Sequence, residues 1–413
     1  MKIRKSHLFY LLVFLSAILS AVISGAIAIV NQKYIPDPRI LGFTIFLVGI
    51  AMTFVIGILF SLPVKGKSVG ARVVDPSFTR LRVLKREEVK YHFLAGIGNA
   101  TYTLSYCVLF SLIGDPSVVI PFVQVVILYL VCVESFTEKN FPTLVELQSA
   151  VIVTIGAILG SISLKGAFNL WAVVVVFLFM NPGWVLLSVY NRKLKRLIIN
   201  GKHNDAFNIR FWNVFFSFIF IAAAFGILGY LTGSSIVLES LRVTIDYFWW
   251  IMVIASAALF GYLFYIRALG FGKASVTQAL RSSTIIFAIP ISILIASYNI
   301  IPLFSFDPVL VLLKVFGIIL ILLGIASYGL TQIKGFLFVK VKKGKPIYGI
   351  MDELWKLQGV TRVSATTGYY DLIVEVRTRS LYKGYEWIIQ GIDSIKSIKY
   401  YQWRSILKEW ENI

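Results

Sequence analysis

Cysteine and histidine are scarce in this sequence, which holds two Cys and three His among 413 residues. Cys107 and Cys132 stand in separate apolar stretches, so we interpret them as buried small side chains and not as a disulfide or a metal pair. His7, His92 and His203 are not spaced like the ligands of a metal ion. Because neither a Ser-His-acid triad nor a pair of catalytic carboxylates can be assembled, the sequence predicts no enzyme and no bound cofactor or metal.

Charged residues are also few, at 15% of the chain, whereas 58% of the residues are apolar. Roughly half is the apolar share of ordinary soluble proteins. The apolar residues form long uninterrupted runs, and about 20 such residues cross a bilayer core. We therefore predict an α-helical polytopic membrane protein with ten transmembrane helices. The predicted spans are 8–31, 40–62, 91–113, 116–134, 143–163, 168–190, 211–231, 247–268, 274–297 and 308–332.

Acidic residues are half as numerous as basic ones, 20 against 40. The basic residues gather in the segments 63–90 and 191–210, which lie on the same side as the N-terminus in a ten-span topology. The loops of the opposite side carry few Lys or Arg. The positive-inside rule then predicts a plasma-membrane protein with both termini in the cytoplasm. This bias explains the net charge of +20, so we expect the lipid bilayer and no nucleic acid as a partner.

The hydropathy pattern changes at residue 334. The segment 336–344 alternates like a strand, 346–359 has helical spacing, and 360–378 has the pattern of two strands joined by a turn. A second helical segment, 380–395, precedes a final strand at 399–410. The order β-α-β-β-α-β predicts a small α+β domain of the ferredoxin-like type at 334–413.

Two motifs of this C-terminal domain have a recognisable form, Leu-Gln-Gly-Val at 357–360 and Thr-Thr-Gly-Tyr-Tyr-Asp-Leu-Ile at 366–373. Over about 336–410 the domain resembles the ligand-binding domain of the leucine-responsive/asparagine-synthesis (Lrp/AsnC) regulators. The resemblance implies a homodimer formed through the sheet and an amino-acid effector bound at the turn. The effector contacts that it implies are Thr367, Gly368, Tyr369 and Asp371. A domain that only dimerises, without a ligand, is the alternative.

The ten spans divide into two sets of five, at 1–163 and 164–333. Five is an odd number, so two such halves would be inverted relative to each other, as in many transporters. The segment 105–124 aligns with 264–283 without a gap, which pairs Tyr106 with Tyr265 and Gln124 with Ser283. Later in each half, 154–161 is similar to 322–329.

The membrane part resembles the drug/metabolite transporter superfamily, in its form with two EamA-type five-helix units. The resemblance covers about 8–332. It depends on the short turn between the third and fourth spans, on Glu138-Lys139 before the fifth, on the tail containing Gly156, and on the stretch Tyr265-x-x-Ala268-Leu269. It implies that a solute binds in a central cavity.

Arg281 is the candidate centre of that cavity. It lies about 10 Å in from the start of its span at 1.5 Å per residue, and Thr277 and Thr284 share its helix face with Gln278 alongside. We expect a cavity walled by the third, fourth, sixth, eighth and ninth spans. The candidate substrate-binding residues are Asn99, Tyr102, Thr103, Tyr106, Gln124, Asn181, Trp184, Tyr262, Tyr265, Thr277, Gln278, Arg281 and Thr284.

A guanidinium suits a carboxylate or a phosphate, so the sequence favours transport of a small organic anion or zwitterion, with an amino acid and export as first candidates. In the alternative interpretation Arg281 reaches lipid headgroups, as we expect of Lys314. Glu134 and Glu146 lie near span ends, where we expect them at the membrane interface. No acid then lies deep in a span, which predicts facilitated exchange or a coupling that avoids a buried acid. Two rival functions remain open, a membrane-anchored sensor without transport and a sugar-phosphate or nucleotide-sugar transporter.

Overall fold

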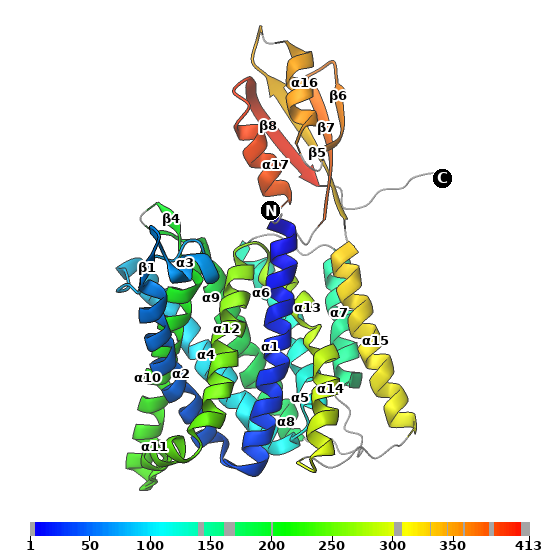
Figure 1. Ribbon diagram of the computed structural model, residues 1–413. Helices are drawn as coiled ribbons and strands as arrows, with labels where there is room; N and C mark the ends of the chain where they lie inside the picture. Colours follow the sequence, from blue (N-terminus) through cyan, green and yellow to red (C-terminus); the bar gives the residue numbers. More distant parts are fainter. Residues whose placement is uncertain are drawn as a thin grey trace. The chain divides into compact units, whose positions relative to one another are not determined.

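The protein is described by a computed structural model that is mostly helical. It covers residues 5–138, 144–160, 170–199, 201–300, 308–330, 332–344, 346–357, 360–379 and 384–405. The chain divides into two compact units (Figure 1). The first comprises Met1–Pro142 and Leu147–Ile325, and the second comprises Thr143–Glu146 and Ala326–Ile413. The two units are described separately.

Eight helical stretches of the first unit are long and apolar enough to cross a membrane. The chain is therefore a multi-pass membrane protein. The helices of these stretches are α1 (Lys5–Lys33), α2 (Pro38–Ser61), α4 (Arg86–Ile113), α5 (Pro116–Gln124) with α6 (Val126–Glu138), α8 (Leu170–Val175) with the π-helix η1 (Val176–Met180) and α9 (Asn181–Arg196), α10 (Ala206–Thr232), α12 (Phe248–Leu269), and α13 (Ala274–Arg281) with α14 (Thr284–Ser297).

The predicted fifth and tenth spans correspond to α7 (Leu144–Gly160) and α15 (Pro308–Leu330), which contain the shorter apolar helices Leu147–Gly156 and Val311–Gly324. Lys139 of the family motif and residues 161–163 of the predicted fifth span lie outside the described residues. Two short helices that the sequence analysis did not predict, α3 (Val69–Val73) and α11 (Ile236–Asp246), lie in segments that it assigned to loops.

Three of the predicted spans are interrupted inside the bundle. The fourth breaks at Val125 between α5 and α6, and the ninth breaks at Ser282 and Ser283 between α13 and α14. The sixth passes through η1 just before Asn181 and Pro182. A proline has no backbone N–H to donate and its ring clashes with the carbonyl of the preceding turn, and π-helical segments occur mostly as single turns inside α-helices. The sixth span therefore continues through Asn181 and Pro182, with a π-helical turn directly before them.

Small residues let two pairs of helices approach closely. Helix α4 packs along α9, and α1 packs along α12. At the α4–α9 contact, a Cβ on Gly98 would lie 2.6 Å from the carbonyl oxygen of Gly183. Helix α4 also packs against α10, and α12 packs against α2. Membrane helices commonly associate through such small residues, because lipid provides no hydrophobic force between them.

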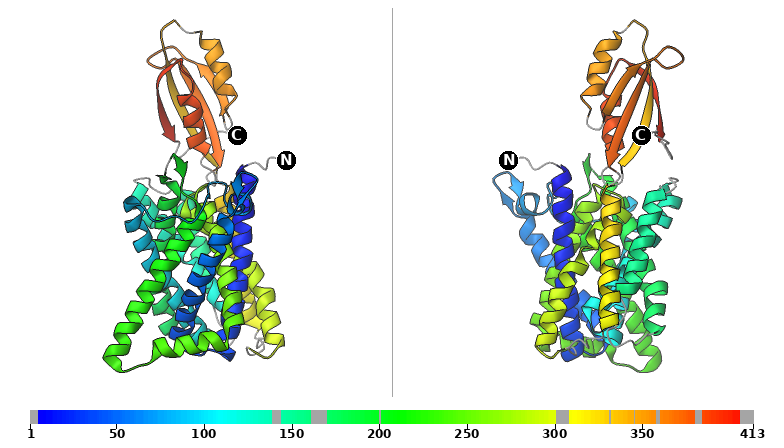
Figure 2. Two further views of the ribbon diagram at one scale, coloured as in Figure 1. Left: turned by 60° about the vertical axis from the view of Figure 1, so that its left-hand side comes forward. Right: turned by 90° about the vertical axis from the view of Figure 1, so that its right-hand side faces the viewer.

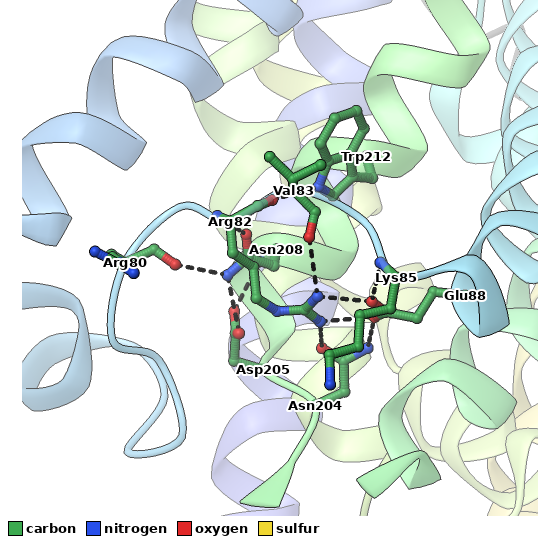
Figure 3. A network of polar contacts seen from close by, with 9 residues as sticks. All are labelled: Arg80, Arg82, Val83, Lys85, Glu88, Asn204, Asp205, Asn208 and Trp212. Carbon is green, nitrogen blue, oxygen red and sulfur yellow. Dashed lines mark hydrogen bonds and ion pairs between the residues drawn. The ribbon is translucent and has the colours of Figure 1, made fainter. Parts of the chain in front are cut away.

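The two basic segments contact each other in a buried network (Figure 3). Arg82 donates to both carboxylate oxygens of Glu88 at 2.6 Å, and it also reaches Asn204 Oδ1 at 2.9 Å. Its backbone N–H donates to Asn208 Oδ1 at 3.0 Å, and Trp212 Nε1 donates to its carbonyl at 3.0 Å. The ion pair with Glu88 raises the pKa of Arg82. The segments 63–90 and 191–210 therefore lie at one end of the bundle.

A second ion pair ties the same segments together. Lys195 donates to Asp75 Oδ2 at 2.5 Å and to the carbonyl oxygen of Asn204 at 2.7 Å, and both charged residues are buried. Asp75 also accepts from the backbone N–H of Ser77 and Ala206, each at 3.0 Å. Burial raises the pKa of Asp75, but the charge and hydrogen bond of Lys195 outweigh it, so the pKa lies below the ordinary value of 3.8.

The predicted loop 191–210 is mostly helical, which corrects the sequence analysis. Helix α9 continues to Arg196 and α10 begins at Ala206, so that 197–205 forms the connection, with the short strands β3 (Ile198–Ile199) and β4 (Lys202–His203). The other connection contains β1 (Pro63–Val64) and β2 (Lys67–Ser68). The charges there look like loop charges in sequence, but several are buried and paired.

The second unit contains one four-stranded antiparallel sheet with the strand order β6-β7-β5-β8. Its elements are β5 (Gln332–Val341), α16 (Ile347–Trp355), β6 (Val360–Ala365), β7 (Leu372–Arg379), α17 (Gly384–Asp393) and β8 (Ile398–Ser405). Alternate strand residues, such as Leu337, Val339 and Val374, pack with Ile350 of α16 and Ile388 of α17. The helices therefore cover one face of the sheet (Figure 2).

Candidate solute-binding cavity

A cavity of about 40 Å³ lies inside the first unit, between α1, α2, α4, α10, α12 and α13. This volume holds a few water molecules and no larger solute, so a solute can enter only when the surrounding helices move. Most of its wall is apolar. The polar side chains that line it are Ser20, Thr53, Tyr102, Thr103, Tyr106, Arg210, Tyr262 and Arg281.

Arg281 lies in the last turn of α13, next to the break before α14, and its side chain is buried. Its Nε donates to Ser16 Oγ at 3.2 Å and its Nη2 to Ser20 Oγ at 2.8 Å, both on α1. The guanidinium carbon lies 4.6 Å from the ring centre of Trp184 and 5.3 Å from that of Tyr265. Within the described part of the chain, no carboxylate pairs with this guanidinium.

Arg210 lines the same cavity from α10. It is 7% exposed, and its guanidinium carbon stands 4.1 Å above the ring centre of Tyr262. Its Nε and Nη1 are buried and have no hydrogen-bond partner among the described residues. The predicted place of Arg210 in the basic loop 191–210 is therefore wrong, because the residue lies in α10 and lines the cavity. The polar neighbours Asn208 and Asn213 on the same helix, both buried, were the signal that could have placed it inside the bundle.

Three predicted tyrosines meet at the cavity. Tyr102 and Tyr106 stack with ring centres 5.5 Å apart, and Tyr106 shares a hydrogen bond of 2.6 Å with Ser24 of α1. The ring centre of Tyr102 lies 4.5 Å from that of Trp184, and the ring centre of Tyr262 lies 5.8 Å from that of Trp184. The cavity therefore has an aromatic wall, and Trp184 connects that wall to Arg281.

Other predicted site residues form a hydrogen-bonded group beside the cavity and do not line it. Trp184 Nε1 donates to Gln278 Oε1 at 3.1 Å, and Gln278 Nε2 donates to Gln124 Oε1 at 3.2 Å. Ser282 Oγ also donates to Gln124 Oε1, at 2.7 Å. Tyr265 donates its hydroxyl proton to Ser188 Oγ at 2.9 Å. These bonds join the broken helices α5–α6 and α13–α14 at their centres.

The remaining predicted residues lie away from the lining. Thr277 donates to the carbonyl oxygen of Lys273, just before α13, at 2.8 Å. Thr284, the first residue of α14, donates to the carbonyl oxygen of Arg281 in α13 at 2.7 Å. Asn99 donates to Ser217 Oγ at 2.9 Å. Asn181 is fully buried, and neither polar atom of its side chain has a partner within the described residues.

The cavity walls differ from those expected from sequence. The fourth and sixth spans contribute no lining residue, whereas α1, α2 and α10 contribute Ser20, Thr53 and Arg210. Polar side chains that bond between helices and polar side chains that face a cavity are indistinguishable in the sequence, so the polar residues of α1, α2 and α10 were not assigned to the cavity.

Glu134 and Lys314 are buried, against the expectation that they lie at the membrane interface. Glu134 pairs with Arg192 at 2.5 Å and accepts from the backbone N–H groups of Ala274 and Ser275, at 2.7 and 3.1 Å. It therefore anchors the N-terminus of α13, where a carboxylate is favoured by the free amides and the helix dipole. Lys314 donates to Ser117 Oγ at 2.7 Å and does not extend to the surface. Cys132 is exposed, although burial was expected.

The predicted effector residues of the second unit surround the turn between β6 and β7. Asp371 accepts from the backbone N–H of Val341 at 2.7 Å and from Lys340 Nζ at 3.0 Å. These bonds hold the pKa of Asp371 below its ordinary value. Gly368 has a φ of +142°, which favours glycine. Thr367 and Tyr369 are exposed, so Tyr369 is accessible whereas Asp371 is already bound within the domain.

No group of His, Cys, Asp or Glu within the described residues could hold a metal ion. No protein-family model and no curated protein matches the chain. Among solved structures, the chain is similar to one crystal structure of a protein, with 17% sequence identity and a TM-score of 0.47. The match covers 79% of this chain and 96% of the other chain.

Proposed function

We propose that the protein is a membrane transporter of a small organic anion or zwitterion, which binds in the cavity lined by Arg281. The observation that carries the proposal is the environment of this guanidinium. It is buried, it faces a cavity, and its described partners are two serine hydroxyls and two aromatic rings. An uncompensated charge inside a membrane protein is costly and usually serves function. An anionic solute would compensate it.

The packing of the bundle supports two inverted halves of five spans each. The ungapped alignment of 105–124 with 264–283 pairs Gln124 with Ser283, and both aligned spans break there, at the ends of α5 and α13. The main contacts between helices of the two halves also agree with the repeat, because each contact has a counterpart in which the two halves are exchanged. The α4–α9 pair corresponds to α12–α1, and α4–α10 corresponds to α12–α2. Inverted repeats with broken helices near the midplane are typical of alternating-access transporters.

The resemblance to the drug/metabolite transporters fits this arrangement, with α7 and α15 as the fifth and tenth spans and both termini cytoplasmic. In such a transporter the cavity alternates between the two sides of the membrane. The small cavity volume corresponds to a state in which the bundle has closed.

Transport by exchange, without proton coupling, agrees with the chemistry of the cavity. No acidic side chain is among its lining residues in the described part of the chain. Glu134 is engaged with Arg192 and with the start of α13, so it serves an ion pair and a helix terminus. We expect that a pH gradient alone does not drive uphill uptake.

The second unit is proposed as a regulatory domain of the ferredoxin-like Lrp/AsnC type. Its sheet order and its β-α-β-β-α-β element order support the ferredoxin-like assignment. An amino acid bound at the exposed side of the turn, near Thr367 and Tyr369, would report the internal pool. Homodimerisation through the sheet is the other proposed role of this domain.

The test is solute exchange in proteoliposomes with the purified full-length protein. Vesicles loaded with one anion are supplied with a labelled anion or amino acid outside, and Arg281→Ala is compared with the wild type. Arg39→Ala is the matched control, because Arg39 is an exposed arginine of the same unit, paired with Asp37. We expect exchange to be lost in Arg281→Ala and retained in Arg39→Ala. Equal exchange by both variants would contradict the role of Arg281.

The sensor alternative predicts a different set of results. A protein that only senses would exchange none of the solutes while its full-length form binds an amino acid, measured by calorimetry. The sugar-phosphate alternative would appear as exchange that is inhibited by sugar phosphates and not by amino acids.

A further inference from the structure

The first unit contains a second cationic group that the proposed function does not require. Arg210 lines the same cavity as Arg281, is 7% exposed, and carries two buried nitrogens without a partner in the described part of the chain. Buried donors of a charged group are costly when they are left unpaired. Its side chain lines the cavity and is 7% exposed, so the cavity is the route by which a partner can approach it.

The two guanidiniums occupy separate places in the cavity. Arg210 stands on the Tyr262 ring, whereas Arg281 stands on Trp184, and the two rings are 5.8 Å apart. Helices α10 and α13 both begin at the end of the bundle that carries the basic segments, as the contact of Gly270 with Lys195 indicates. Counted from their helix starts, Arg210 lies about 6 Å and Arg281 about 10 Å deep, at 1.5 Å per residue. A solute that enters from this end meets Arg210 first.

We infer that the solute is a dianion with an anionic group at each of its two ends, one bound by Arg210 and the other by Arg281. This inference rests on the proposed function. Two like charges in one low-dielectric cavity repel each other, and a solute with one negative charge compensates only one of them. The described lining residues offer no carboxylate for the ammonium group of a zwitterion. A small dicarboxylate supplies both charges at separate points, and each planar guanidinium suits a carboxylate.

The apolar part of the cavity lining fits the carbon chain of such a solute. Ile254, Ala255 and Ala258 of α12 line the cavity on the helix that also carries Tyr262. Methylene groups of a short dicarboxylate would contact these side chains and the tyrosine rings. Chain length would then determine which dicarboxylate reaches both arginines.

The test compares dicarboxylates with monocarboxylates of equal carbon number on the purified full-length protein. Succinate, glutarate and adipate are paired with butyrate, valerate and hexanoate. Binding is measured by the rise in melting temperature with ligand concentration, and transport by inhibition of labelled-anion exchange in proteoliposomes. Wild type, Arg210→Ala, Arg210→Lys and the control Arg39→Ala are compared. Arg210→Lys keeps the positive charge and guards against a loss of folding in the alanine variant.

We expect a dicarboxylate to bind more tightly than its monocarboxylate partner. Arg210→Ala should weaken dicarboxylate binding by about tenfold to a hundredfold, the value of one charge-assisted contact, and leave monocarboxylate binding nearly unchanged. Arg210→Lys should give an intermediate affinity for dicarboxylates, and Arg39→Ala should behave as wild type.

Several results would overturn the inference while transport stands. Equal weakening of monocarboxylates and dicarboxylates in Arg210→Ala would show that Arg210 acts only on the fold. Tight binding of leucine, unaffected by Arg210→Ala, would assign a zwitterion that uses one arginine. Tighter binding of glycerol phosphate than of every dicarboxylate would show that the two negative charges of the solute belong to one phosphate group. The proposed function fails separately if no tested anion or amino acid is exchanged by the wild type.

Discussion

Replacing Asp75 with alanine should strongly destabilise the first unit. Asp75 is 3% exposed and bonds to Lys195, which is 8% exposed. It also accepts from the backbone N–H of Ala206, the first residue of α10. The substitution leaves the buried ammonium with one described carbonyl partner and leaves this N–H without its carboxylate. The segment 63–90 then loses its direct bond to α9.

The size of the effect follows from the loss of one partner of a buried ion pair, about 3–5 kcal/mol. At about 2 °C per kcal/mol for a large unit, the melting temperature should fall by about 6–10 °C. Replacing both partners, in Asp75→Ala with Lys195→Met, removes the unpaired charge. The double variant should therefore be less destabilised than the sum of the two single variants.

The assay is thermal unfolding of the purified protein in detergent, followed by intrinsic fluorescence, for wild type, both single variants and the double variant. Asp37→Asn is the control, because it breaks an exposed ion pair with Arg39 that should contribute about 0–1 kcal/mol. The reasoning would be refuted if the shift of the double variant equalled the sum of the two single shifts. A shift in Asp75→Ala no larger than that of the control would also refute it.

The same carboxylate predicts an acid dependence. Its folded pKa is below 3.8, so protonation occurs more readily in the unfolded chain. The stabilisation is complete above 3.8 and is lost as pH falls through the lower, folded pKa. Wild type should therefore lose melting temperature in this acidic range more steeply than Asp75→Asn. Parallel curves would show that the ion pair does not contribute.

Three further predictions concern other parts of the protein. Gly98→Val should prevent the close contact of α4 with α9, because a Cβ there meets the Gly183 carbonyl oxygen at 2.6 Å; the folded fraction in gel filtration should fall sharply, and a normal profile would contradict the packing. Trp184→Ala removes a fully buried ring that stacks with Arg281 and should lower the free energy of unfolding by about 3–5 kcal/mol. Trp184→Phe should lower it less; equal melting temperatures of the two variants would argue against this. Asp371→Asn should reduce the acid sensitivity of the second unit, since its folded pKa is lowered and its stabilisation is lost as pH falls through that value; hydrogen exchange of that unit at acidic and neutral pH measures this.

Sequence reasoning located the eight long apolar stretches because they depend on a local property, the length of an apolar run. It also located positions that matter within them. The gapless alignment predicted Gln124 and Ser283 as equivalent positions, and the helices break at both. The turn containing Gly368 was found because 360–378 has the pattern of two strands joined by a turn, and Gly368 there has a φ that favours glycine. These features are each encoded within a few neighbouring residues.

The charged residues show where this reasoning fails. Arg210 falls one residue before the predicted start of its span, so its charge was added to the adjacent loop, although it faces the cavity. Glu134 near a span end was expected at the interface, but Arg192 and the start of α13 bury it. Whether a charge at a helix end faces water or protein depends on segments distant in sequence. Hydropathy and loop counting carry no information about such partners.

The pairing of the basic segments also separates two stages in the life of the chain. During insertion the lysines and arginines of 63–90 and 191–210 act as free charges, which is the state that the positive-inside rule concerns. In the folded protein Arg82 and Lys195 are neutralised by Glu88 and Asp75. Pairing covers Arg82 in part and Lys195 almost fully, so the surface at this end presents fewer free basic groups than the two segments contain.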